Sequence, residues 1–492
     1  MKSFRLSKSK YIAGLQCHKR LWLEIHKPEL APPPSPGMQR IFDQGTTVGE
    51  MATEEFPDGV LIEADYLNIP KALEQTKEVL DNSVNIIFEG CFVHENVLVR
   101  PDIILHNELG SWNMIEVKSS TTVKPENIND VAVQSWVLQG CGLDMERVFL
   151  KHINRECVYP NLSNLFKTVD ITEQVREAIP TIPNNLSEFQ SMLDKPEPDV
   201  PIGENCTNPY SCQFAEYCWK DIPDHSIFTI PRLRWTVKER LIAENKINID
   251  DLPSSLSLND TQLKYIRSLD TNKSIIDWNS IAEELEKLKY PLHFLDFETD
   301  GPAVPRFDGI HPYEQFPFQY SCHIIDKNGK VTHKEYLHES KSDPRKSLAE
   351  TLVKAIGKKG TVIAYNAPFE KGVLNRLAGW FPEHSVALGS IADRLWDQLA
   401  IFRNHYTDYR FGGSNSLKSV LPVIVPSMSY ENLGVSDGGE AQVTWNEMIR
   451  LPEGSEKNKL VKDMKEYCGQ DTWAMVEIHN KLVESKESWI IL

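Results

Sequence analysis

The stretch YPLHFLDFETDG, residues 290–301, decides the fold of the second half of this chain. It opens with an apolar run that is typical of a buried β-strand, and it ends in acids. Asp296 and Glu298 are two residues apart, so their side chains point to the same face of the strand. From about residue 289 onward the pattern continues as strand, strand, helix, strand, helix, which predicts an α/β domain.

Two later segments carry further acids. Residues 360–378, GTVIAYNAPFEKGVLNRLA, predict a buried strand followed by a helix, with Glu370 near the helix start. Residues 458–482 have helical periodicity, and Tyr467 and Asp471 lie four apart on one helix face. Acids from a strand, a helix start and a late helix suit a two-metal phosphodiester site, where Tyr467 could orient or deprotonate the attacking water. Each acid taken alone could equally be a solvated surface group.

Together these segments resemble the DnaQ-like 3′→5′ exonucleases with an RNase H fold, of the four-carboxylate type with tyrosine. The resemblance rests on DFE (296–298), YNAPFE (365–370) and YCGQD (467–471), with DQLAIF (397–402) and SLKSVLP (416–422) in the intervening places. It implies that Mg²⁺ or Mn²⁺ is bound by Asp296, Glu298, Glu370 and Asp471, with Tyr467 as a catalytic residue. That family normally has aspartate at the position of Glu370, and Asp397 would be the substitute ligand.

A loop precedes the second strand of this domain, which PFQYSCH (317–323) predicts. Arg306, His311 and Tyr313 lie in that loop. They could touch the substrate, or they could be ordinary loop residues.

The first half contains a second group of polar residues on predicted strands. Residues 97–105, VLVRPDIIL, and 112–118, WNMIEVK, read as neighbouring strands of a hairpin. Glu116 and Lys118 share a face, and Asp102 on the other strand can meet them. Two carboxylates can hold Mg²⁺ or Mn²⁺, and a lysine can stabilise developing charge. A surface hairpin with an ordinary Glu/Lys pair would show the same short pattern.

This region resembles the PD-(D/E)XK nucleases of the RecB-like group. The matching pieces are RPD (100–102), EVK (116–118), the helix VAVQSWVLQ (131–139) and the upstream segment FDQGTTVGEMA (42–52). The resemblance implies metal binding by Glu50, Asp102 and Glu116, and catalytic roles for Lys118 and Gln134.

Four cysteines form a third group. Cys206, Cys212 and Cys218 follow a C-x5-C-x5-C pattern, and Cys17 lies in YIAGLQCHKRLW (11–22). Four thiolates suit an iron–sulfur cluster or zinc. One early and three late cysteines resemble the iron–sulfur RecB-like nucleases, although the triplet spacing is wider here. The resemblance implies a structural cluster, 4Fe–4S in preference to Zn²⁺.

Composition limits the classes of protein that fit. The 492 residues include 53 basic and 70 acidic side chains, a net charge of -17, which argues against a chain that coats nucleic acid nonspecifically. A local basic groove can still hold a phosphate backbone. The N-terminus lacks the apolar core of a signal peptide, and no stretch approaches the roughly 18 apolar residues of a membrane span. We therefore expect a cytoplasmic protein.

The sequence thus predicts a multidomain α/β protein with three parts. These are a PD-(D/E)XK restriction-endonuclease-like domain (1–222), a helical connector (223–288) and an RNase H-like domain (289–492). The two resemblances imply a metal-dependent nuclease that acts on nucleic acid, with DNA expected ahead of RNA. Two alternatives stay open: an RNA-processing exonuclease, and a noncatalytic iron–sulfur scaffold that binds nucleic acid, in which Glu370 marks a decayed site.

Overall fold

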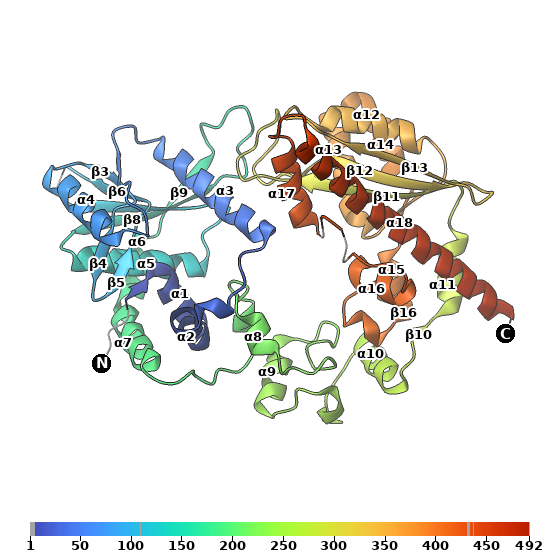
Figure 1. The fold of residues 1–492 in the computed structure, drawn as a ribbon, viewed down its shortest axis with the longest axis horizontal. Helices are drawn as coiled ribbons and strands as arrows, with labels where there is room; N and C mark the ends of the chain where they lie inside the picture. Colours follow the sequence, from blue (N-terminus) through green and yellow to red (C-terminus); the bar gives the residue numbers. More distant parts are fainter. Residues whose placement is uncertain (1–4, 109, 431–432, 436, 492) are drawn as a thin grey trace. The chain divides into compact units, whose positions relative to one another are not determined.

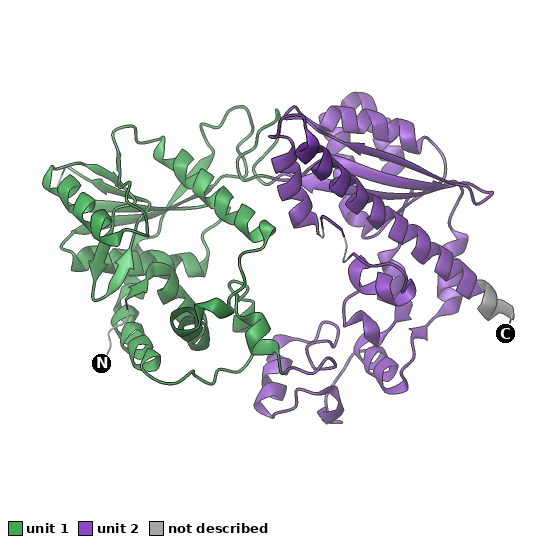
Figure 2. Cartoon of the chain, viewed as in Figure 1, with its two compact units in different colours: residues 1–221, 302–313 green, residues 222–301, 314–492 purple. Residues whose placement is uncertain are grey.

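The computed structural model describes residues 5–108, 110–430, 433–435 and 437–491. The chain is a mixed α/β protein of two compact units, shown in Figure 2. Unit 1 comprises residues 1–221 and 302–313, and unit 2 comprises residues 222–301 and 314–492. The first division falls one residue from the expected boundary. The expected connector, 223–288, groups with unit 2. Among the described helices, none has the length and apolar character needed to cross a bilayer.

Unit 1 contains a six-stranded sheet and a three-stranded sheet with helices around them (Figure 1). The strand order of the larger sheet is β2-β3-β6-β7-β8-β9, and that of the smaller sheet is β1-β5-β4. The strands are β1 (Leu6–Ser7), β2 (Val60–Leu61), β3 (Ile86–Phe88), β4 (Phe92–His94), β5 (Val97–Val99), β6 (Ile103–His106), β7 (Trp112–Lys118), β8 (Met145–Ile153) and β9 (Phe166–Asp170). The helices are α1 (Lys8–Gln16), α2 (His18–His26), α3 (Pro36–Thr53), α4 (Ile69–Asp81), α5 (Pro125–Gly140), α6 (Thr172–Ala178), α7 (Ile182–Leu193) and α8 (Ala215–Trp219).

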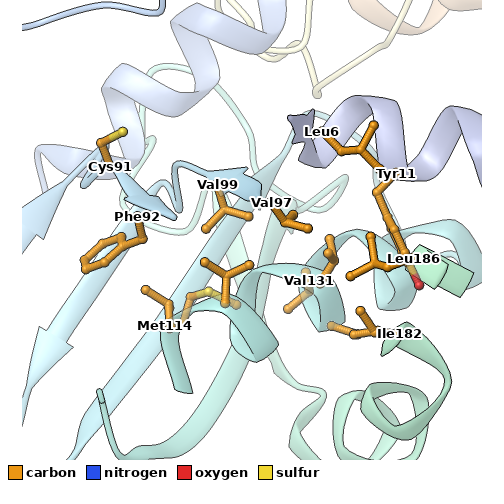
Figure 3. Close-up of a cluster of buried hydrophobic side chains, with 14 of the residues drawn as sticks. Leu6, Tyr11, Cys91, Phe92, Val97, Val99, Met114, Val131, Ile182 and Leu186 are labelled. Carbon is orange, nitrogen blue, oxygen red and sulfur yellow. The ribbon is translucent and has the colours of Figure 1, made fainter. Parts of the chain in front are cut away.

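Alternation along β7 sends its side chains to two different cores. Met114 packs in the cluster that contains Val131 of α5, drawn in Figure 3 with Leu6, Val97 and other members. Ile115 and Val117 pack in a separate cluster with Val48 and Ala52 of α3. Because side chains alternate along a strand, Glu116 and Lys118 share the α5 face with Met114.

The predicted strand 97–105 is interrupted, which corrects the hairpin expected there. β5 ends at Val99 and belongs to the smaller sheet, whereas β6 begins at Ile103 and pairs antiparallel with β7. Pro101 lies in the break, and a proline cannot donate to a strand ladder. Asp102 therefore lies immediately before β6 rather than within a continuous strand.

Unit 2 contains a five-stranded sheet and a two-stranded sheet. The strand order is β13-β12-β11-β14-β15 in the larger and β10-β16 in the smaller. The strands are β10 (Ile275–Ile276), β11 (Leu292–Asp300), β12 (Phe316–Ile325), β13 (Val331–Leu337), β14 (Thr361–Ala364), β15 (Leu395–Asp397) and β16 (Tyr406–Thr407). The helices are α9 (Trp235–Ala243), α10 (Asp260–Thr271), α11 (Trp278–Glu286), α12 (Arg345–Ile356), α13 (Ala367–Trp380), α14 (Ser385–Ala392), α15 (Leu399–Asn404), α16 (Leu417–Ile424), α17 (Gly438–Met448) and α18 (Ser455–Ile491).

β11 lies in the middle of the larger sheet and is covered on both faces. Leu295 and Phe297 pack in a cluster with α12, α13 and α14. Leu292 and Phe294 pack on the other face, against Met475 of α18. The strand pairs antiparallel with β12 and parallel with β14. This double burial explains why residues 292–297 read as an apolar run without clear alternation.

Candidate active sites

The acids of β11 continue the face that packs on α18. Asp296 and Glu298 follow Phe294 at alternate positions, so they point to the side of the sheet where α18 brings Tyr467, Cys468 and Asp471. Ligand-competent atoms of Asp296, Glu298 and Cys468 lie within 4.8 Å of one another. The Cys468 thiol lies 3.9 Å from Asp296 Oδ2. The structure therefore brings the predicted strand acids and the predicted helix together.

Glu298 is buried and Asp296 and Asp471 are half-buried, and the three carboxyl groups repel one another. Burial raises the pKa of Asp296 and that of Glu298 well above the ordinary range, and the neighbouring Asp471 carboxylate raises both further. Burial also raises the pKa of Asp471, to about 6, although the Tyr430 hydroxyl donates to its Oδ1 at 2.6 Å and opposes the shift. Carboxyl groups in this arrangement would be stabilised by a bound cation.

Glu370 is placed in the first turn of α13, as predicted, and it is buried. Burial raises its pKa to about 8, and its Oε2 has no hydrogen-bond partner among the described residues. Asp397 has a different role, because its Oδ1 accepts from the backbone N–H groups of Asn366 at 3.0 Å and Ala367 at 3.3 Å. It caps the start of α13, where anionic groups are favoured. Glu370 is therefore available as a ligand, and Asp397 is structural.

A cavity of about 640 Å³ in unit 2 opens beside these acids. Asp296, Tyr467 and Asp471 contribute to its wall, and so do three basic side chains: Arg232, Arg403 and Lys418. Anionic and cationic groups thus share one cavity, which suits a ligand that is itself a phosphate with bound cations. Sequence analysis missed Tyr430, Lys418 and Cys468. Lys418 lies in SLKSVLP (416–422) and Cys468 in YCGQD (467–471), so these two motifs could have indicated both residues.

Tyr467 lies one helical turn before Asp471 on α18. Burial raises the pKa of Tyr467 far above its ordinary value, and the neighbouring Asp471, Glu298 and Asp296 raise it further. The hydroxyl therefore keeps its proton at neutral pH in this arrangement. It can donate a hydrogen bond and orient a water molecule, while a role as general base is disfavoured.

In unit 1, Glu116 is the centre of a buried polar cluster. The side chain is 1% exposed, and its Oε1 accepts from Lys118 Nζ at 2.7 Å and from Lys8 Nζ at 2.8 Å. Gln134 Nε2 donates to Oε2 at 2.8 Å. Asp102 Oδ2 accepts from the backbone N–H of Val117 at 2.6 Å, which holds it beside the same strand. Asp102, Glu116, Lys118 and Gln134 are thus gathered as predicted.

The two carboxyls of this cluster have opposite protonation preferences. Burial and then the Glu116 charge raise the pKa of Asp102 to about 8. Burial opposes ionisation of Glu116 too, but the ammonium groups of Lys118 and Lys8 outweigh it and lower the pKa of Glu116 below its ordinary value. Burial likewise opposes the charge of Lys118, yet Glu116 and Asp130 raise its pKa well above normal. Lys118 is therefore an ammonium that can stabilise negative charge.

Glu50 does not join this group, which corrects the resemblance-based assignment. It is exposed on α3, and α3 packs on the face of β7 that carries Ile115 and Val117. Glu116 points to the opposite face, toward Gln134 of α5. The third acid near Asp102 is Glu89, whose backbone N–H donates to Asp102 O at 3.2 Å and whose charge acts on the Asp102 carboxyl.

Sequence analysis did not identify two charged neighbours of Glu116, Asp130 and Lys8. Asp130 accepts from Lys118 Nζ at 2.5 Å, and it lies four residues before Gln134 on α5, a spacing that could have revealed it. Lys8, the first residue of α1, lies 108 positions from Glu116. No local pattern indicates such a contact.

The four predicted cysteines line one small cavity in unit 1. Cys17 lies at the junction of α1 and α2, and the other three lie on the loop and short helix at residues 206–218. Gln16 Nε2 holds this loop by donating to Asn205 O at 2.6 Å and Tyr210 O at 2.7 Å. Burial raises the thiol pKa of Cys212 and of Cys218, and the other cysteines of the group add to both shifts. Convergent thiols with unfavourable mutual charge fit a metal-containing group.

The loop with Arg306, His311 and Tyr313, for which substrate contact and an ordinary loop were both open, belongs to unit 1 and not to the predicted RNase H-like domain. The Tyr313 hydroxyl donates to Ser119 O, and His311 Nδ1 lies 3.0 Å from Arg155 O. Tyr159 N donates to Ile310 O at 3.1 Å. The segment is thus built into the first unit although the flanking strands, β11 and β12, belong to the second.

Comparisons with known proteins find partial similarities. A family model described as "Domain of unknown function (DUF2779)" matches residues 293–416, which include Asp296, Glu298 and Glu370 but not Asp471. An "Uncharacterized protein MG366 homolog" from Mycoplasma pneumoniae is 26% identical over 234 residues, 44% of this chain and 35% of that protein. "Uncharacterized protein MG366" from Mycoplasma genitalium is 24% identical over 257 residues, 48% of this chain and 37% of that protein. The chain therefore matches little more than a third of these relatives' length.

A solved structure described as "Crystal structure of SSO0001" covers 45% of this chain and 89% of its own. Its sequence identity is 16% and the TM-score is 0.22, which is too low to establish a common fold.

Proposed function

We propose that this protein is a divalent-metal-dependent nuclease with two active sites, and that DNA is its substrate. The proposal includes an RNase H-like exonuclease site in unit 2 and a PD-(D/E)XK-like site in unit 1. One observation carries it above all: half-buried acids from β11 and α18 converge beside a cavity that also presents arginine and lysine side chains. Oxygen-rich, negatively charged donor sets of this kind suit Mg²⁺ or Mn²⁺.

In unit 2, Asp296, Glu298, Glu370 and Asp471 would hold the cations. Such cations, when bound, activate water and neutralise charge on the phosphate. Tyr467 would orient the attacking water through its retained hydroxyl proton. Arg232, Arg403 and Lys418 would bind phosphates of the substrate strand from the cavity wall. The substrate would be trimmed from a 3′ end.

In unit 1, Asp102 and Glu116 would hold the cation. Lys118, kept protonated by Glu116 and Asp130, would stabilise negative charge on the scissile phosphate. Gln134 fixes the Glu116 carboxylate through its bond to Oε2. The four cysteines would carry an iron–sulfur cluster that ties the start of the chain to the loop at 206–218. A cytoplasmic location is proposed with it, because thiols stay reduced there.

The test is a digestion panel of end-labelled single- and double-stranded DNA and RNA with Mg²⁺ or Mn²⁺. Four forms are compared: wild type, Asp296→Asn, Lys118→Ala and the double variant. We expect Asp296→Asn to slow release of 3′-terminal nucleotides at least about 100-fold, since even supporting residues of metal sites are worth 10–100-fold. Lys118→Ala should slow the other cleavage by roughly 10²- to 10³-fold. The double variant should be inactive.

Matched controls are Asp393→Asn and Lys167→Ala, which change exposed residues of α14's end and of β9. Both should cleave like wild type. A double variant that digests every substrate at the wild-type rate would refute the proposal. If cleavage requires the substrate 2′-OH, the substrate is RNA and not DNA.

A further inference from the structure

A second cavity of unit 1 opens beside Lys118, and the proposed chemistry does not use it. Its volume is about 510 Å³. The wall combines residues from five separate parts of the chain, and those used below are Lys118, Lys124, Arg155, Tyr210 and Tyr313. We call this cavity the Lys118 groove.

Tyr313 is held firmly in the wall of the Lys118 groove. Its backbone has φ 61°, a left-handed conformation that is costly for a bulky residue. Its hydroxyl donates to the carbonyl of Ser119, the residue directly after Lys118. Its ring packs in the cluster that contains Val117 and Ala303. Strain of this kind persists only where the surroundings enforce it, which indicates that the ring's placement is specified.

Tyr210 reaches the same groove from the loop between Cys206 and Cys212. Its carbonyl accepts from Gln16 Nε2 at 2.7 Å, so α1 fixes the loop at this residue. The Tyr210 side chain remains 47% exposed. An aromatic ring on an anchored backbone, open to solvent, is available to a ligand.

Cations complete the groove. Lys124 and Arg155 are exposed, and the Lys124 ammonium lies 3.9 Å from Glu126 Oε1. Exposed pairs of that kind contribute little and are readily exchanged. Lys118 adds a third basic side chain to the wall. Basic side chains that follow a backbone, interleaved with aromatic faces, are the features that bind single-stranded nucleic acid, because unpaired bases can stack.

We propose that the Lys118 groove binds a single-stranded nucleic-acid segment, with bases stacked on Tyr210 and Tyr313 and phosphates held by Lys124 and Arg155. The inference deepens the proposed function, because it rests on Lys118 facing the scissile phosphate. It gives the segment 302–313 a role: residues inserted between β11 and β12 supply part of the substrate site of unit 1.

The test measures binding without cleavage. A fluorescein-labelled single-stranded DNA, the same sequence as RNA, and a duplex are titrated with the full chain in EDTA, and anisotropy is recorded. Tyr210→Ala and Tyr313→Ala should each weaken single-strand binding by roughly 5- to 150-fold, the range for loss of one stacking contact. Tyr210→Phe should bind like wild type. Tyr66→Ala, an equally aromatic change at a residue 76% exposed elsewhere in unit 1, is the control and should have no effect.

Because Tyr313→Ala could disturb folding, a second variant, Lys124→Glu/Arg155→Glu, changes exposed charges only. It should weaken binding and flatten its salt dependence. Photocrosslinking of an oligonucleotide that carries 5-iodouracil should map to Tyr210 or Tyr313. Unchanged affinity in all these variants, or equal affinity for duplex, overturns the proposal.

The two proposals can fail separately. If the chain binds single strands through these residues but does not cleave them, the binding proposal holds and the nuclease proposal fails. If the tyrosine variants cleave as efficiently as wild type, the nuclease proposal holds and the binding proposal fails. Tighter binding of RNA than of DNA would support the proposed single-strand binding and would identify RNA as the preferred strand.

Discussion

In unit 1, two ammonium groups donate hydrogen bonds to the Glu116 carboxylate. Lys8 and Lys118 both donate to Glu116 Oε1, at 2.8 and 2.7 Å. Only Lys118 shares β7 with Glu116, while Lys8 comes from the start of α1. The Lys8 ammonium therefore occupies the position that a divalent cation bound by Glu116 would take. We expect Lys8 and the cation to compete for Glu116 Oε1.

Removing the Lys8 charge should accordingly strengthen metal binding in unit 1. In an Asp296→Asn background, which silences unit 2, we expect Lys8→Met to lower the Mn²⁺ dissociation constant about tenfold, since one nearby unit charge at a partly buried site is worth a few kcal/mol at most. Calorimetric Mn²⁺ titration measures this directly. Lys10→Met, two residues further along α1, is the control.

An unchanged Mn²⁺ affinity in Lys8→Met would show that the ammonium does not compete. If cleavage by unit 1 then disappeared as well, Lys8 would have to act on the substrate instead.

Local spacing decided which site residues the sequence could reveal. Asp296 with Glu298, and Glu116 with Lys118, are neighbours on one strand face, and Tyr467 with Asp471 are neighbours on one helix face. Contacts made across the fold left no such pattern. Tyr430 reaches Asp471 from 41 residues away. Glu50 was assigned from a family pattern. The structure packs α3 on the face of β7 that carries Ile115 and Val117, opposite to the face that carries Glu116.

Among the elements, the junction of β11 and β14 depends on one glycine. Gly360 has φ 89°, and a Cβ there would lie 1.9 Å from the carbonyl oxygen of Pro291. Gly360→Ala should destabilise unit 2 by about 2 kcal/mol or more, through backbone strain and overlap. By contrast, Gly379 is an exposed residue near the end of α13 with open space around it, and Gly379→Ala should stabilise by about 0.5 kcal/mol. Urea unfolding of both variants distinguishes the outcomes. Equal midpoints would contradict the account of Gly360.

The cysteines of the loop at 206–218 line one cavity with Cys17, and this arrangement predicts that the chain binds a metal or cluster. Cys212→Ser should reduce iron or zinc bound per chain to near zero and abolish any visible absorbance, because a cluster needs all of its thiolates. Cys141→Ser is the matched control, since Cys141 is exposed and lies outside the group. It should retain the full content. Metal analysis of the purified chains decides, and a Cys212→Ser protein with wild-type metal content would rule out this cysteine as a ligand.

Long or doubly buried elements were predicted well, and short or exposed ones were not. Residues 458–482 were expected to be helical, and α18 contains them. β13 was missed because its residues are mostly exposed and show little apolar alternation. The break at Pro101 separates β5 from β6, which the run VLVRPDIIL conceals. Apolar runs indicate burial, but they do not say where one sheet ends and another begins.

For the whole molecule, the buried acids should make stability depend on pH when no metal is present. Folding raises the pKa of Glu370 to about 8 from 4.5 and that of Asp471 to about 6 from 3.8. The folded chain therefore binds more protons than the unfolded chain in this window. The stabilising contribution of these two groups is full below about pH 4 and falls as pH rises toward 8, by on the order of 2 kcal/mol between pH 6 and 8 for Glu370 alone.

Thermal unfolding in EDTA at pH 6, 7 and 8 measures this trend. We expect the transition assigned to unit 2 to move to lower temperature as pH rises, and saturating Mn²⁺ to restore it at pH 8. Asp296→Asn removes one of the repelling charges, so its midpoint should fall less. Identical midpoints at pH 6 and 8 for the wild-type protein would show that these acids do not titrate in this window.

The course of the backbone has one further consequence. It passes from unit 1 to unit 2 after residue 221, returns at 302 and leaves again after 313. No single cut can therefore release either unit whole: a fragment ending at 221 lacks Tyr313, and a fragment beginning at 222 carries 302–313 without its packing partners. Exchanging either unit by recombination would therefore require two coordinated replacements, because residues 302–313 would have to be exchanged together with residues 1–221.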